Sequence, residues 1–473
     1  MRMVATQLLK GSRCNRAPAS LILILPPFVP PGAQDGRTVL EDAGVARCQA
    51  STRLSSARLV LMDEPTAAIS VRQVAEVLEL IRRLKHQNIA VILAGVILAG
   101  FAGSVLAERL AAGSNKRVLL IDRRPDPLAG HTWSFHDGDL DPAQRAWLAP
   151  AIRRAWDGQD VRFPGYARAL RSGYASVDAD SLGAVLADLP AVSRLTARVV
   201  SIDAGGVTLA DGQRIDADLA IDARGFAPHP AIQVRFQKFL GQELRLTAPH
   251  GLTRPVIMDA TVPQMDGYRF FYLLPFDDTR LLVEATYYSD GAALSATDQR
   301  AAIADYAAGQ GWQVAQVIRE ESGVLPIALR FDAESFWRAL PADVPAIGLR
   351  AMRFHALTGY SLPHAVRSAD LVARHWRQGP RVLARALRRD SLSDARAQGF
   401  YRLLSRMLFE AAAPDERRRV MERFYRLPEP LVERLYAGRS TLADKARILT
   451  GRPPVPVAKA LRCLHGTLKE RPA

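Results

Sequence analysis

The stretch Val96–Asp122, VILAGFAGSVLAERLAAGSNKRVLLID, decides how the rest of the chain is interpreted. An apolar run leads into a glycine turn, a segment of helical periodicity follows, and a second apolar run ends at Asp122. This order predicts strand, tight loop, helix and strand, the first half of a dinucleotide-binding fold. A helix that begins after Gly103 would offer free N–H groups and the positive end of its dipole to a pyrophosphate. The Asp122 carboxylate would accept a hydrogen bond from the adenosine ribose.

The glycine fingerprint of such folds is incomplete in this chain. In the pattern Gly-x-Gly-x-x-Gly, Gly100 and Gly103 take the second and third positions, but Leu98 stands where the first glycine makes the tight turn. The five residues VILAG occur twice in succession, at 91–95 and 96–100. The last glycine of the first copy is therefore an alternative first glycine if the loop is longer.

Length and charge limit the classes of function. A chain of 473 residues can form two or three domains, and its net charge of +15 favours anionic partners. Because no zinc-finger spacing and no aromatic-rich RNA motif occurs, we expect an acidic membrane surface as that partner and no nucleic acid. Three scattered cysteines indicate a reducing compartment and neither a disulfide framework nor a metal cluster. The apolar run 89–107 contains glycines, which favour a buried strand and helix over a membrane span.

The chain before the dinucleotide-binding segment has two parts. Residues 1–53 have no sustained periodicity and predict a disordered leader. Residues 54–95, with an apolar strand ending in Asp63 and Glu64, resemble the Walker B half of an ABC transporter ATPase. No phosphate-binding Gly-x-x-x-x-Gly-Lys-Ser/Thr loop accompanies it, so we expect no ATP binding. The VILAG repeat lies at the junction with the next domain and is typical of a fusion scar.

A hairpin is the second informative feature. Residues 263–290 contain two aromatic and β-branched runs, 268–274 and 280–287, separated by a short acidic turn. Glu284 lies between Val283 and Ala285 in the second run. Buried among apolar neighbours, it would have a raised pKa and could act as a general acid; on the solvent face of an ordinary hairpin, it would do neither. Alternation alone leaves both possibilities open.

Two further stretches carry candidate residues. Residues 131–139 hold two histidines and two aspartates, but their spacing matches no common set of metal ligands, so we expect no metal. Residues 346–370 predict strand, loop and helix, and the helix begins after Gly359 and Ser361, where its N-terminus could face a cofactor. The tail 371–473 is helical and basic, and forms either a solvated face or an amphipathic patch on acidic lipid.

Taken together, residues 96–473 resemble a bacterial lycopene β-cyclase, a flavin-binding carotenoid cyclase. The motifs that carry the resemblance are HTWSFHDGDL at 131–140, DGYRFFYLLP at 266–275, LLVEATYYSD at 281–290, FHALTGYSLPHAV at 354–366 and RFYRLPEPLVERLYAGRSTLADKARILTGRPPVP at 423–456. The resemblance implies an α/β fold of the FAD/NAD(P)-binding Rossmann-like type. An antiparallel-sheet substrate domain would be inserted within residues 96–370, and a helical basic region would follow at 371–473.

The resemblance also implies a reaction. Lycopene or another linear carotenoid would be drawn from the membrane and cyclised through γ-carotene to β-carotene, on the cytoplasmic face of the cell membrane. FAD would act in its reduced form, with NAD(P)H as reductant and no net redox change. Glu284 would be the acid. The implied cofactor contacts are Gly100, Gly103 and Asp122 for the ADP part, Asp222, Gly225, Gly348, Thr358 and Gly359 nearer the flavin, and His131.

Six residues depart from the family pattern. The family has glycine at Leu98, an acid at Ala285, and Gly-Leu-Phe-His-Pro-Thr where residues 352–357 read MRFHAL. Met352 places bulk, and Arg353 a charge, where a backbone should approach the cofactor. We expect the loss of an acid at position 285 to remove a candidate proton relay beside Glu284. Two alternatives therefore accompany the cyclase interpretation: a flavin-dependent monooxygenase or dehydrogenase acting on an apolar substrate, and an inactive membrane-associated remnant.

Overall fold

The computed structural model describes residues 99–112, 117–125, 128, 130–451 and 454–464, and the backbone of strands 22–24, 60–62 and 89–94. The chain divides into two compact units, Met1–Leu84 and Lys85–Ala473. In the first unit, strands β1 (Ile22–Ile24) and β2 (Val60–Met62) pair in parallel. The rest of the predicted leader and most of the ATPase-like fragment lie outside the described residues, and the boundary at residue 95 stays a prediction.

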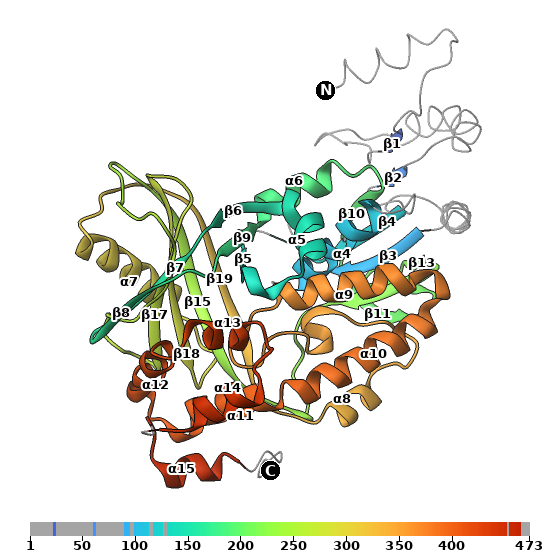
Figure 1. Ribbon diagram of the computed structural model, residues 1–473. Coiled ribbons are helices and arrows are strands. Elements are labelled where there is room, and N and C mark those ends of the chain that lie inside the picture. Colours follow the sequence, from blue (N-terminus) through green and yellow to red (C-terminus); the bar gives the residue numbers. More distant parts are fainter. Residues whose placement is uncertain are drawn as a thin grey trace, which may run out of the picture. The chain divides into compact units, whose positions relative to one another are not determined.

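A parallel sheet forms the nucleotide-binding half of the second unit, as predicted (Figure 1). Its strand order is β10 (Val192–Thr196), β4 (Arg117–Asp122), β3 (Ile89–Ala94) and β14 (Leu219–Ala223). Helix α4 (Ala99–Ala112) connects β3 to β4 and packs against α9 (Leu362–His375). A small antiparallel sheet of β11 (Val199–Asp203), β12 (Gly206–Leu209) and β13 (Arg214–Asp216) precedes β14.

The first strand of this sheet contains residues of the first VILAG copy, whereas the sequence predicted it at the second copy. The strand is built from residues 89–94, which include the first copy, and α4 begins at Ala99 rather than after Gly103. The first copy pairs in register with β4 on one side and with β14 on the other. Gly100 and Gly103 therefore lie in the first turns of the helix.

Two further sheets form the inserted domain. The larger one has the order β19 (Val314–Phe331), β15 (Ile232–Leu246), β18 (Arg280–Ser289), β17 (Tyr268–Pro275), β16 (Val256–Asp259), β7 (Gln159–Phe163) and β8 (Tyr166–Leu170). The smaller one consists of β5 (Thr132–His136), β9 (Tyr174–Asp178) and β6 (Ile152–Trp156). The predicted hairpin is confirmed as the antiparallel pair β17–β18. The sequence analysis did not predict the long strands β15 and β19. Their many charged residues obscure the alternation of apolar and polar residues that indicates a strand.

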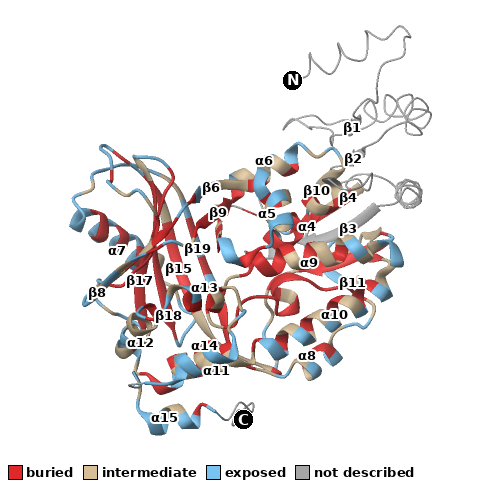
Figure 2. Ribbon diagram, viewed as in Figure 1, coloured by how far each residue is buried: buried red, intermediate tan, exposed pale blue. Residues whose placement is uncertain are grey.

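Helices account for most of the remaining chain. Between β4 and the C-terminal region they are α5 (Pro142–Leu148), α6 (Ala179–Ala187), α7 (Ala296–Gly309) and α8 (Ala333–Ala339). The C-terminal region contains α10 (Pro380–Ala397), α11 (Gly399–Arg406), α12 (Arg417–Tyr425), α13 (Glu429–Tyr436), α14 (Leu442–Leu449) and α15 (Val457–Arg462). Figure 2 shows exposed residues along α10 and α15. Of the helices in the described part of the chain, none is long and apolar enough to cross a membrane.

Not all of the basic tail is a solvated face. Arg417 is 1% exposed, and its guanidinium donates to the carbonyl oxygens of Leu408 and Tyr288, each over 3.1 Å, and pairs with Asp290. The neighbouring Tyr425 is also fully buried. This arginine therefore ties the C-terminal helices to the end of β18 and is unavailable to an external partner.

A buried ionic cluster joins the small sheet to the large one. Glu243 of β15 has no exposed surface, and its carboxylate accepts hydrogen bonds from Arg153 of β6, Arg280 of β18 and Arg319 of β19 over 2.6–3.0 Å. Asp178 of β9 pairs with Arg153 and lies 3.8 Å from Arg319. We call these five residues the Glu243 cluster. Although burial raises the pKa of Glu243, the hydrogen bonds and charges of Arg153 and Arg319 lower it to about 2.

Replacing Glu243 with Gln should destabilise the fold strongly, because the variant leaves the three half-buried arginines of the Glu243 cluster with Asp178 as the one remaining carboxylate of that cluster. We expect the free energy of unfolding to fall by about 3 kcal/mol at pH 7. Since the folded-state pKa is about 2 against an ordinary 4.5, this difference should be complete above pH 4.5 and shrink as the pH falls toward 2. Denaturant unfolding at several pH values measures it.

The matched control is Glu320→Gln, which removes a more exposed pair with Arg300 on the opposite face of β19. It should cost less than about 1 kcal/mol. Equal losses in the two variants would contradict the structural importance of the Glu243 cluster.

Candidate active site

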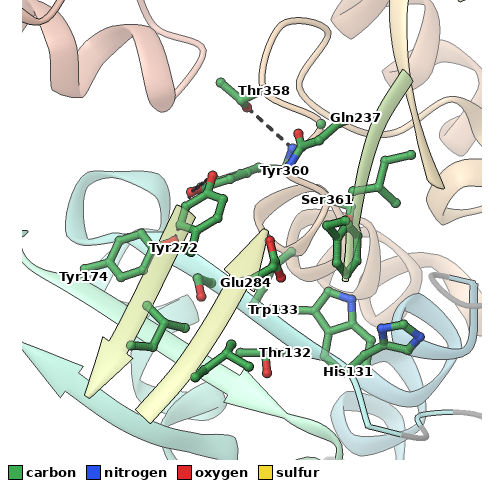
Figure 3. Close-up of a pocket in the computed structure, with 17 residues that line it drawn as sticks. His131, Thr132, Trp133, Tyr174, Gln237, Tyr272, Glu284, Thr358, Tyr360 and Ser361 are labelled. Atoms are coloured by element: carbon green, nitrogen blue, oxygen red, sulfur yellow. Dashed lines mark hydrogen bonds between the residues drawn. The ribbon is translucent and has the colours of Figure 1, made fainter. Parts of the chain in front are cut away.

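Glu284 lies at the wall of a cavity between the inserted domain and the N-terminus of α9 (Figure 3). The cavity measures about 690 Å³, part of which opens to solvent. Aromatic and polar side chains line it: His131, Thr132, Trp133, Ser134, Tyr174, Gln237, Phe239, Tyr272, Thr358, Tyr360 and Ser361. Figure 3 shows the Glu284 side chain directed into this space. Of the two orientations that the sequence left open, the structure therefore has the one that faces a cavity.

The surroundings of Glu284 favour its protonated form. Burial raises its pKa to about 7, and hydrogen bonding to Thr286 and contact with Glu321 oppose that rise. The Thr286 hydroxyl lies 2.6 Å from Oε1 of Glu284. At neutral pH, a large fraction of the Glu284 side chains thus carries a proton, as a general acid requires.

The side chain at position 285 does not lie beside Glu284, where a proton relay was expected. Successive side chains of a strand point to opposite faces. Ala285 accordingly packs in a separate apolar cluster with Leu240 and Val283, on the face of β18 away from Glu284. An acid at position 285 would not stand beside Glu284 in space, and its absence here removes no relay across the cavity.

The carboxyl that does approach Glu284 is Glu321 of β19, which sequence reasoning missed. Its side chain is 1% exposed, and Arg319 lies 3.3 Å from its Oε2. Burial raises the pKa of Glu321 well above its ordinary value, the charge of Arg319 opposes this and the charge of Glu284 adds to it. No local sequence signal could have paired the two, because they meet only through the register of β18, β15 and β19.

Several polar atoms at this cavity have no partner in the protein. The indole N–H of Trp133 and the amide oxygen of Gln237 are buried and unpaired. His131 is buried beside them, and burial lowers its pKa to about 4, so it is neutral at pH 7. Thr358 and Gly359, the latter at φ +75°, form another part of the wall. Unpaired donors and acceptors beside aromatic rings suit a planar ligand with polar edges.

The carboxyl edge of the parallel sheet has the features of a nucleotide site. Asp122 ends β4, is 3% exposed, and its Oδ2 has no partner, while Oδ1 accepts from the Arg124 backbone over 2.9 Å. Gly348, at φ +60°, approaches α4 so closely that a Cβ there would lie 2.8 Å from Cβ of Ala102. These residues and the α4 N-terminus fit the ADP part of a dinucleotide.

A ring stack connects this edge to the cavity. Phe101 in the first turn of α4 lies parallel to Trp133, with ring centroids 4.3 Å apart. Trp133 also lines the Glu284 cavity, so its indole lies between the N-terminal turn of α4 and that cavity. Of the sequence-predicted residues, Glu284, His131, Thr358 and Gly359 line the cavity, and Gly100, Gly103, Asp122 and Gly348 belong to the sheet edge and its helix.

Asp222 and Gly225 lie at the end of β14 and outside this cavity. The Asp222 carboxylate already accepts hydrogen bonds from Arg224 over 2.8 and 2.9 Å and from Arg350 over 3.0 Å. Although burial raises its pKa, these arginines lower it below the ordinary value. Gly225 has φ +62°, which glycine adopts readily. Through its hydrogen bond with Arg350, Asp222 holds the loop that contains Gly348. Direct contact of Asp222 or Gly225 with a cofactor stays a prediction.

Leu98 lies outside the described residues, and two further departures from the family pattern, Met352 and Arg353, have local solutions. Met352 has φ +56°, a conformation that favours glycine, and is held there by burial in the core. The Arg353 guanidinium pairs with Asp390 over 2.7 Å and with Asp394 over 3.2 Å on α10. Its charge is therefore neutralised by α10, and neither side chain lines the Glu284 cavity.

The histidine-rich stretch has structural contacts. His136 accepts or donates a hydrogen bond with Gln159 over 2.8 Å and packs against the ring of Tyr436, 4.4 Å away. Among the residues that the structure describes, no three His, Cys, Asp or Glu side chains come together as a metal site.

A second, apolar cavity of about 1060 Å³ lies among the C-terminal helices. Its walls include Met407, Phe424, Leu449 and Val455, and Thr358 lines both this cavity and the one at Glu284. The two cavities therefore lie next to each other at Thr358. Exposed apolar residues lie on the helices around it, with Leu449 47%, Val457 55% and Leu461 57% exposed.

Comparison with known proteins agrees with this architecture. Among solved structures, a flavin-dependent halogenase from Xanthomonas campestris has a TM-score of 0.50 at 13% identity, covering 80% of this chain and 94% of its own, which shows a shared fold. A ribose import ATP-binding protein from Rubrobacter xylanophilus is 42% identical over only 62 residues, 12% of each chain.

Longer matches identify the family. The chain is 48% identical over 376 residues to a lycopene beta-cyclase from Paracoccus sp. (strain N81106 / MBIC 01143), covering 79% of this chain and 96% of that protein. It is 46% identical over 372 residues to a lycopene beta-cyclase from Pantoea ananas, covering 78% and 97%. A family model described as "Lycopene cyclase protein" matches residues 93–462. The chain therefore belongs to the lycopene cyclase family.

Proposed function

We propose that this chain closes the ψ ends of lycopene into β-ionone rings, through γ-carotene to β-carotene, by acid catalysis without net redox change. The observation that carries the proposal is Glu284, whose carboxyl faces a cavity of aromatic side chains with a pKa raised to about 7. The family to which the chain belongs supports the choice of substrate.

Each step of such a reaction has a matching feature in the cavity. Glu284 gives its proton to the terminal alkene, which becomes a tertiary carbocation. A neighbouring double bond attacks the cation, which closes the ring, and the new cation then loses a C–H proton to the Glu284 carboxylate to form the ring double bond. The rings of Tyr272, Tyr360 and Trp133 limit access of water to the cation, and their π faces favour positive charge. Because His131 is neutral, it adds no opposing charge.

The residues present fit FAD as the cofactor. Asp122, the α4 N-terminus and the close approach of Gly348 would hold the ADP part, and Trp133 and Gln237 would meet the polar edges of the ring system. His131, Thr358 and Gly359 would be further contacts in the cavity wall. Reduced FAD, with NAD(P)H as its reductant, would supply negative charge that stabilises the carbocation.

The apolar cavity supports a long hydrocarbon substrate taken from a membrane. A linear polyene can extend from the Glu284 cavity past Thr358 into the space lined by the C-terminal helices. We infer that the exposed apolar residues around that space bind an acidic lipid surface, since the chain carries a net charge of +15. The enzyme would then work peripherally on the inner face of the cell membrane.

Replacing Glu284 with Gln should abolish ring closure, because the amide cannot supply the proton. We expect a loss of at least about 100-fold in the rate of β-carotene formation from lycopene in liposomes, with reduced FAD present. Chromatography of the carotenoids measures it. The variant should bind FAD like the wild type, as judged by flavin absorbance, and Glu284→Asp should retain partial activity.

Two outcomes would contradict the proposal. Full activity of Glu284→Gln would exclude this carboxyl as the acid. Stoichiometric consumption of NAD(P)H by the wild type, with an oxidised product, would instead support a flavin-dependent monooxygenase or dehydrogenase.

Removing apolar side chains from α15 should weaken membrane binding. Val457 and Leu461 lie four residues apart, on one face of the helix, and both are more than half exposed. We expect the double substitution V457S/L461S to reduce binding to anionic phospholipid vesicles about tenfold, since less apolar surface enters the interface. Co-sedimentation with vesicles measures it.

The matched control is Val200→Ser, which removes a side chain of 53% exposure from β11. It should bind vesicles like the wild type. If both variants bind equally well, or if uncharged vesicles bind as tightly as anionic ones, the proposed docking face is wrong.

A further inference from the structure

Three residues on neighbouring strands form a row across the large sheet beside the cavity. In the register of the sheet, Gly241 of β15 lies opposite Glu284 of β18 on one side and opposite Glu321 of β19 on the other. Residues directly opposite each other on neighbouring strands project to the same face. The two carboxyl side chains therefore stand on one face with only the middle strand between them.

Gly241 allows these side chains to come together. A Cβ built at Gly241 would lie 3.2 and 3.3 Å from Cβ and Cγ of Glu284 and 3.3 Å from Cγ of Glu321. The two glutamates thus occupy the space that a side chain on β15 would otherwise fill. Any larger residue at position 241 would separate them.

Away from Glu284, the Glu321 carboxyl meets Arg319 at one oxygen and has no hydrogen-bond partner at the other. Its Oε2 faces Arg319, and its Oε1 is buried without a hydrogen-bond partner. Arg319 is already committed to the Glu243 cluster, where its Nε lies 2.7 Å from Oε2 of Glu243. One guanidinium therefore serves several carboxylates, and Glu321 receives only part of its charge.

A count of charges gives the protonation state of this region. The Glu243 cluster holds three guanidiniums and two carboxylates, and Glu284 and Glu321 bring the carboxyls to four. If all were ionised, negative charge would exceed positive by one in a region that is largely buried. One bound proton restores balance. The other titratable groups lining the cavity, His131, Tyr174, Tyr272 and Tyr360, are kept neutral at pH 7 by burial.

We propose that Glu321 and Glu284 form a carboxyl pair that shares one proton, and that Glu321 is the positioning residue through which the pair keeps that proton at neutral pH. This inference rests on the proposed function. An O–H bond of the pair breaks as a C–H bond forms on the alkene, and the pair then carries two negative charges beside the carbocation. When the ring loses its proton, the C–H bond breaks and the O–H bond re-forms on the pair, so no proton is consumed.

Replacing Glu321 with Gln should lower the pH at which the site loses its last proton. Without the second carboxyl, the three guanidiniums are balanced by Asp178, Glu243 and an ionised Glu284. We expect the alkaline limb of the kcat profile to move down by about one pH unit, so that activity is lost at pH 8 and largely kept at pH 6. The control Glu320→Gln, on the opposite face of the same strand, should leave the profile in place.

A second variant and a second measurement keep the proposal testable if Glu321→Gln misfolds or is inactive. Gly241→Ala keeps both glutamates but places a methyl group between them, and should shift the alkaline limb in the same direction as Glu321→Gln. Infrared difference spectra of the full-length protein with FAD should show a protonated carboxylic acid band that disappears with rising pH. Burial also raises the pKa of Glu108 to about 7, so the band of the pair is the component that E284Q/E321Q lacks, and the midpoint of that component should fall in both variants.

The outcomes separate the pair from the proposed reaction. A shifted infrared band in a protein that makes no cyclic product would support the carboxyl pair and overturn the proposed function. A midpoint or a pH profile that is the same in wild type, Glu321→Gln and Gly241→Ala would overturn the pair.

Discussion

The ionic bonds between Glu243 and three arginines are the interaction on which the rest of the site depends. Glu243 of β15 binds arginines from β6, β18 and β19, and so joins the small sheet to the large one in a fixed register. That register sets Gly241, two residues earlier, between Glu284 and Glu321. Charge pairing at one point of the sheet thus positions the candidate acid at the next. The positive charge of Arg319 also reaches Glu321, which couples structure to protonation.

The two halves of the site follow from two sheets with different tasks. The parallel sheet presents the ends of its strands and the α4 N-terminus, which suit an anionic nucleotide. The large sheet of the inserted domain presents a face of aromatic and carboxyl side chains, which suits a cation in an apolar space. The stack of Phe101 on Trp133 brings the two together. Of the residues that depart from the family pattern, Arg353 is neutralised by Asp390 and Asp394 of α10 instead of facing the cavity.

Local patterns predicted the elements well and their pairing poorly. The α/β class, the hairpin of β17 and β18 and the helical tail follow from periodicity and from the family motifs. The first strand was misplaced because the VILAG repeat offers two equivalent copies, and only pairing with β4 and β14 selects the earlier one. Glu321 was missed and position 285 was overvalued for one reason: chain neighbours on a strand face opposite ways, whereas true neighbours come from other strands. Trp133 and Gln237 emerged only as unpaired atoms in a cavity.

The Glu284 carboxyl should hold a proton at neutral pH in its cavity of aromatic and polar side chains. Labelling with N,N′-dicyclohexylcarbodiimide, which reacts with protonated carboxyls in apolar surroundings, tests this most directly when read out by mass spectrometry of peptides. The account predicts modification of Glu284 at pH 7, a decrease as the pH rises, and protection by a bound linear carotenoid. An unmodified Glu284 at every pH, with labelling of surface carboxyls only, would contradict it.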